Sequence, residues 1–169
     1  GDLVLGADGI RSDLGPLEAE ARLAVELTRA GEAEGVNVLG AFLGTDPLLR
    51  DRVLVVGAHF DHLGTDPDGA IYNGANDNAS GVAALLEIAR SWQEAGYAPE
   101  ITVLFAAWDG EEQGLLGARH YVAHPAFPLS ATVGMIQLDM VGMADEGVLT
   151  YDGGGNAVGP VSYTHLRAH

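Results

Sequence analysis

The stretch 52-RVLVVGAHFD-61 decides the fold class of this chain. Its run from Val53 to Val56 is continuously apolar and rich in β-branched residues, which is typical of a strand buried on both faces. Residues 101–107 and 133–138 show the same pattern. Strands of this kind occur in parallel sheets that carry helices on both sides, so the chain is expected to contain at least three of them.

The segments between these strands have helical spacing. Apolar residues recur one turn apart at Val82, Leu85, Leu86, Ala89 and Trp92. We expect a helix here, with Asn78 or Ser80 as its N-cap and Gly96 at its end, and a second helix over residues 112–123. The alternation of strands and helices predicts an α/β fold, with a mostly parallel mixed sheet sandwiched between helices.

The two ends of the chain differ from the middle. Residues 1–20 are expected to be an N-terminal remnant or linker, and residues 23–27 and 36–43 a hairpin of outer strands. The last nine residues, VSYTHLRAH, match the translation of a common sequencing adaptor, GTCTCTTATACACATCTCCGAGCCCAC. We therefore expect residues 161–169 to be a non-native tail that interrupts the natural sequence at about Pro160.

Composition narrows the possible partners. The net charge is −16 and the pI about 4.4, so neither nucleic acid nor an anionic membrane is an expected partner. No apolar run is long enough to cross a bilayer. The chain has no cysteine, which excludes disulfides and thiolate zinc sites. The oligomeric state is left open by the sequence.

Acidic residues follow each of the three predicted buried strands. The carboxyl ends of parallel strands meet at one edge of the sheet, where ligands bind in folds of this kind. Five carboxylates gathered there would repel one another unless cations lay among them. We expect two divalent ions beside these acids and one histidine: His59, Asp61, Asp77, Glu111, Glu112 and Asp139.

The spacing of these residues suggests separate roles. His59 and Asp61 lie two apart, so Asp61 can accept the second N–H of His59 while the other ring nitrogen binds metal. Glu111 and Glu112 are adjacent and their side chains diverge, so one can bind metal while the other acts as general base. Asp77 can either reach two ions or cap a turn. Surface or packing roles are expected for the remaining natural histidines, His62, His120 and His124.

Four motifs together resemble the co-catalytic zinc aminopeptidases of peptidase family M28. They are His59-x-Asp61, Gly74-Ala-x-Asp77-Asn-x-Ser-Gly81, Gly110-Glu-Glu-x-Gly-Leu-Leu-Gly117 and Leu138-Asp-Met140. The resemblance makes residues 21–160 part of a catalytic domain that holds two zinc ions. It implies that His59 and Asp139 bind one ion, that Glu112 binds the other and that Asp77 bridges them. It further implies Glu111 as general base, Asp61 as the residue that orients His59, and a cis peptide bond after Asp77.

The resemblance also sets expectations for function. It implies a metallopeptidase that removes N-terminal residues from peptides with a free N-terminus, in a secreted or extracytoplasmic location. In the family, a histidine downstream of the Leu138-Asp-Met140 segment binds the second zinc. This chain has no histidine between Met140 and the adaptor-like tail, so we expect the chain as given to be inactive. Alternatives on the same fold are a carboxypeptidase, a single-zinc glutaminyl cyclase-like acyltransferase and a non-catalytic receptor-like ectodomain. The presence of every other ligand favours the peptidase.

Overall fold

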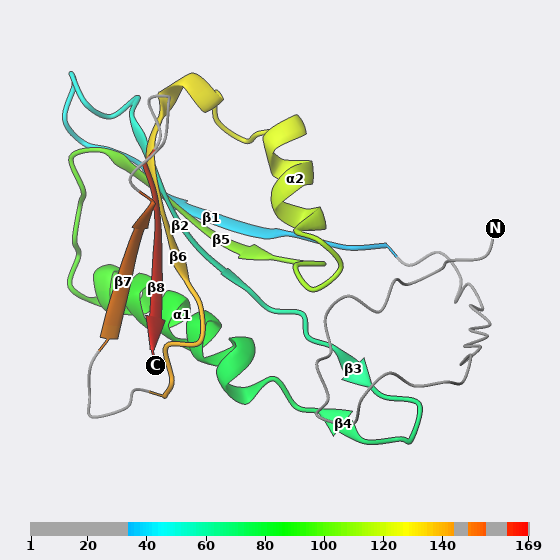
Figure 1. The fold of residues 1–169 in the computed structure, drawn as a ribbon. Helices are drawn as coiled ribbons and strands as arrows, with labels where there is room; N and C mark the ends of the chain where they lie inside the picture. The colour runs from blue at the N-terminus through cyan, green and yellow to red at the C-terminus, as the bar shows by residue number, and fades with distance from the viewer. Residues whose placement is uncertain (1–33, 144–148, 155–161, 169) are drawn as a thin grey trace, which may run out of the picture. The chain divides into compact units, whose positions relative to one another are not determined.

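A computed structural model describes residues 34–143, 149–154 and 162–168, which belong to one compact unit, Glu34–His169. Their main feature is a six-stranded sheet with the order β1-β5-β2-β6-β8-β7 (Figure 1). The central pairs, β5–β2, β2–β6 and β6–β8, are parallel, and β1 and β7 pair antiparallel at the two edges. The predicted mixed, mostly parallel sheet is confirmed. The strands are β1 (Val38–Phe42), β2 (Val53–His59), β5 (Thr102–Trp108), β6 (Thr132–Leu138), β7 (Leu149–Gly154) and β8 (Ser162–Ala168).

Two helices cover opposite faces of this sheet (Figure 1). On one face, α1 (Ser80–Glu94) packs Leu85 into a cluster that includes Val56 and Phe105. On the other face, α2 (Leu116–Ala123) packs Tyr121 into a second cluster, with Val55, Leu104 and Trp108. Alternate residues of the buried strands supply the two clusters, because successive side chains point to opposite faces. The predicted sandwich is therefore confirmed.

The second helix begins at Leu116, four residues later than the sequence predicted. Residues 110–115 form a turn instead, in which the Leu116 amide donates to the Gly110 carbonyl and the Gly117 amide to the Asp109 carbonyl. The amides of Glu111 and Glu112 donate to the carboxylate of Asp61, from another part of the chain. A tertiary contact of this kind leaves no signal in local helical spacing.

The shorter elements lie at the connections. A two-stranded hairpin of β3 (Gly64–Thr65) and β4 (Ile71–Tyr72) follows β2, and a distorted turn, η1 (Ala75–Ala79), leads into α1. A 3-10 turn, η2 (Leu129–Ala131), precedes β6. The predicted outer strand over 36–43 is β1, which pairs with β5 at the sheet edge; its predicted partner, 23–27, lies outside the described residues.

The backbone of β8 joins the sheet between β6 and β7, with Gly134 opposite Ser162. Strand pairing uses main-chain groups, which do not depend on the side chains. The pairing of β8 therefore does not distinguish a natural segment from a translated sequencing adaptor. The non-native origin of residues 161–169 stays a prediction. Within the described part of the chain, no helix is long and apolar enough to cross a membrane.

Candidate metal centre

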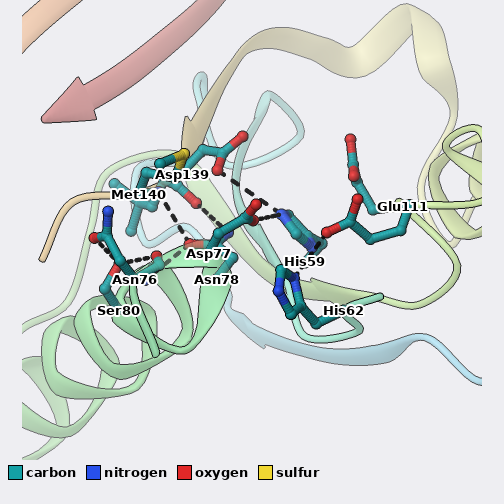
Figure 2. Close-up of polar contacts among 12 residues, drawn as sticks. His59, His62, Asn76, Asp77, Asn78, Ser80, Glu111, Asp139 and Met140 are labelled. Atoms are coloured by element: carbon teal, nitrogen blue, oxygen red, sulfur yellow. Dashed lines mark hydrogen bonds and ion pairs between the residues drawn. The ribbon is translucent and has the colours of Figure 1, made fainter. Parts of the chain in front are cut away.

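His59 is the centre around which the acidic residues gather (Figure 2). It is the last residue of β2 and only 1% exposed. Its Nε2 atom lies 3.2 Å from Asp77 Oδ1 and 3.8 Å from Asp139 Oδ1. Figure 2 shows Asp77 and Asp139 on one side of the imidazole and Glu111 on the other. Residues from four separate segments thus meet at the carboxyl end of the sheet, as predicted.

The orientation of the His59 ring is set by the next turn of the chain. Its Nδ1 atom lies 3.2 Å from the main-chain carbonyl oxygen of Asp61. Because a carbonyl only accepts, Nδ1 is the donor, and Nε2 is left facing Asp77 and Asp139. Burial by itself lowers the pKa of His59, but the nearby carboxylates of Asp139 and Glu111 raise it to about 9. The acids therefore favour a positive charge at Nε2, which a proton or a metal ion can supply.

The carboxylate of Asp61 has a different main contact from the one the sequence predicted. Its Oδ1 is 3.6 Å from His59 Nδ1, beyond hydrogen-bonding distance. Instead, Oδ1 accepts the amide of Glu111 at 2.9 Å and Oδ2 that of Glu112 at 3.1 Å. These two donors begin the turn after β5 and have no partner within it. Asp61 thus orients His59 through its main chain and holds the two glutamates through its side chain.

The described residues contain one group of potential ligands suited to a metal ion. Atoms of His59, Asp77 and Glu112 all lie within 4.8 Å of one another. Zinc accepts imidazole nitrogen and carboxylate oxygen together, so these residues fit that ion. Glu111 lies beside the group without belonging to it. Burial raises the pKa of Glu111, the charge of His59 opposes the rise, and neighbouring acids add to it, namely Glu112, Asp139 and Asp61.

Asn78 connects the Asp77 segment to the Asp139 segment. Its side chain is buried, donates to the Leu138 carbonyl at 2.9 Å, and accepts the amides of Gly81 at 3.0 Å and Met140 at 3.2 Å. Asn78 therefore accepts an amide of the first turn of α1, but the N-cap position is Ala79, between the two predicted caps Asn78 and Ser80. The Asp77–Asn78 peptide bond is cis, as the resemblance implied. The carboxylate of Asp77 faces His59.

His62 was missed by reasoning from the sequence. We predicted a surface or packing role, because an extended chain would direct it away from His59. The strand does not continue: β2 ends at His59, residues 60–63 belong to no strand, and His62 Nδ1 lies 2.9 Å from Glu112 Oε1. His120 and His124 are exposed, as predicted, with stacked rings 4.6 Å apart.

Fold and site together define an α/β protein with a metal-binding group at the carboxyl end of its sheet. The model of peptidase family M28 matches residues 37–166. The chain belongs to this family.

Three proteins to which the chain is similar have different activities. The chain is 37% identical over 121 residues to leupeptin-inactivating enzyme 1 of Streptomyces exfoliatus, covering 71% of this chain and 26% of that protein. A zinc aminopeptidase from Bacillus subtilis matches with a TM-score of 0.55 and 30% identity, over 78% of this chain and 34% of the other. A glutaminyl cyclase from Tannerella forsythia matches with a TM-score of 0.50 and 29% identity, over 64% and 42%. The chain thus spans about a quarter of the length of the first of these relatives.

Proposed function

We propose that this chain is part of a zinc-dependent aminopeptidase. The observation that carries the proposal is the group of His59, Asp77 and Glu112, with ligand atoms within 4.8 Å of one another and Glu111 at its side. A second support is the similarity to a zinc aminopeptidase over 78% of the chain. The substrate would be a peptide with a free N-terminus.

The chain's own residues would divide the work of hydrolysis. Zinc, when bound, would polarise the scissile carbonyl and make a water molecule easier to deprotonate. Glu111 would take the proton of the attacking water and pass it to the leaving amine, a role suited to a carboxylate whose pKa is raised. Asp61 would hold Glu111 in place through its amide. The acids beside His59 would attract the positively charged α-amine of the substrate.

We propose two ions rather than one. His59 and Asp139 would hold the first and Glu112 the second, with Asp77 between them. Asp77 suits this role because its carboxylate is a third exposed and 3.2 Å from His59 Nε2, so it has room to face a second ion. Native mass spectrometry of the longer protein would count the ions; a single zinc at saturation would contradict this arrangement. A location outside the cytoplasm stays a prediction, for cell fractionation to test.

Glutaminyl cyclase activity is the second candidate, because a glutaminyl cyclase shares the fold at 29% identity. The two functions differ in substrate: a cyclase releases ammonia from an N-terminal glutamine, whereas an aminopeptidase releases the N-terminal residue. Incubation of the longer protein with a glutaminyl peptide and a leucyl anilide separates them. Release of ammonia without release of aniline would favour the cyclase.

Separate substitution of each of the two adjacent glutamates by glutamine tests the proposed division of roles. Glu112→Gln removes a ligand oxygen and should weaken zinc binding, measured by competition with a chromogenic chelator. Glu111→Gln should leave zinc binding nearly unchanged and, in the longer protein, lower kcat on leucyl anilide by about 10²- to 10⁴-fold. Metal lost from the Glu111 variant and kept in the Glu112 variant would reverse the assignment.

A further inference from the structure

His62 lies close to the metal group without belonging to it. Among the described residues, the group of potential ligands consists of His59, Asp77 and Glu112. The contact of His62 is with one member of the group, since its Nδ1 lies 2.9 Å from Glu112 Oε1. A carboxylate in its ionised form only accepts, so Nδ1 carries the proton and donates it to Glu112.

The His62 ring is itself held in place by two other segments. Tyr72 of β4 meets it edge to face, with ring centroids 6.3 Å apart. On another side is Gly74, which has a φ of 65° and where a Cβ atom would come within 3.0 Å of His62 Cγ. The side chains of His62 and Glu112 are 20% and 17% exposed. A partly buried donor held by two neighbouring segments fixes its acceptor better than a mobile surface side chain does.

We infer that His62 is a positioning residue for Glu112. The hydrogen bond to Oε1 restricts rotation of the carboxylate and keeps it turned toward His59 and Asp77. The carboxylate then loses less conformational entropy when an ion binds, and its negatively charged oxygens stay oriented toward the site. The inference rests on the proposed function only in taking zinc as the ion.

Two substitutions separate the hydrogen bond from the packing. His62→Phe keeps a ring against Tyr72 and Gly74 but removes the donor, and His62→Leu gives a second, smaller donor-free variant. His62→Asn places an amide N–H near the position of Nδ1 and gives up the ring. We expect the donor-free variants to weaken zinc binding about 10- to 100-fold, and His62→Asn to stay within a few-fold of the natural residue.

The measurement is the zinc dissociation constant of the longer protein, by competition with a chromogenic chelator, with circular dichroism as the check on folding. The longer protein is needed because the ion held by Glu112 is expected to lack a histidine ligand in the 169-residue chain. His124→Phe is the matched control, since it removes an exposed histidine outside the site. Unchanged affinity in the donor-free variants would overturn the inference. So would an equal loss in His62→Asn, which would show that the ring or direct ligation matters. Absence of zinc binding in the unsubstituted longer protein would instead refute the proposed zinc site.

Discussion

The two halves of the metal site are attached to the protein in different ways. Asp77 and Asp139 are joined through Asn78, whose side chain is 1% exposed and makes three hydrogen bonds to the main chain. Glu111 and Glu112 lie instead on a partly exposed turn between β5 and α2. The side chain of Asp61 holds that turn from outside. The first half is therefore part of the core, whereas the second is an attachment to it.

This difference separates stability from metal binding. Changes in the core-linked half should lower the free energy of unfolding, because they leave buried polar groups without partners. Changes in the attached half should mostly affect zinc affinity. The polar groups that lose a hydrogen-bond partner there are partly exposed, so they can form hydrogen bonds to water instead. The following variants test this separation. For each variant, the free energy of unfolding is measured with urea in the presence of EDTA, and zinc affinity is measured in a separate experiment.

Asn78→Ala is expected to have the largest effect. It removes a buried side chain whose nitrogen donates one hydrogen bond and whose oxygen accepts two, and it leaves the Leu138 carbonyl and two amides without partners. We expect a loss of about 3–5 kcal/mol in the free energy of unfolding. Asn73→Ala is the control: Asn73 is exposed, and its change should stay within about 0.5 kcal/mol. A similar small value for Asn78 would show that the core link is not needed.

Gly81→Ala should act on the same half by crowding. An added Cβ atom would lie 2.4 Å from both Asn78 Oδ1 and the Leu138 carbonyl oxygen, so the start of α1 and the end of β6 must move apart. We expect a loss of about 2–3 kcal/mol. Gly40→Ala on the edge strand β1 has nothing within 4 Å of its Cβ. Equal unfolding free energies for the two alanine variants would contradict this account of the packing.

Asp61→Ala moves the test to the attached half. It leaves the amides of Glu111 and Glu112 without their acceptor, but both residues are partly exposed and water can replace it. We expect a loss of only about 1–2 kcal/mol in the free energy of unfolding and a fall in zinc affinity of about 10- to 100-fold. A large loss of stability with unchanged zinc affinity would mean that this half is as much part of the core as the other.

The same difference explains how much the sequence could predict. The buried strands β2, β5 and β6 were predictable because burial on both faces requires continuous apolar runs such as Val53 to Val56. The gathering of the acids followed from where those strands end. The partner of the Asp61 carboxylate and the place of His62 were not predictable, because both depend on how the chain turns after His59. That turn is fixed by contacts with residues about fifty positions away, which leave no local pattern.

Asn37→Ala should have the smallest effect and tests how the attached half joins the sheet edge. Asn37 precedes β1, accepts the amide of Asp109 at 3.1 Å and donates to the carbonyl of Gly117 at 2.8 Å, so it bridges the two ends of the turn that carries the glutamates. Its side chain is only partly buried, so we expect a loss of about 1 kcal/mol in urea unfolding. Because Asp61 still holds the amides of Glu111 and Glu112, zinc affinity should fall less than in Asp61→Ala. A larger fall in affinity than in Asp61→Ala would show that the edge strand, and not Asp61, sets the position of the glutamates.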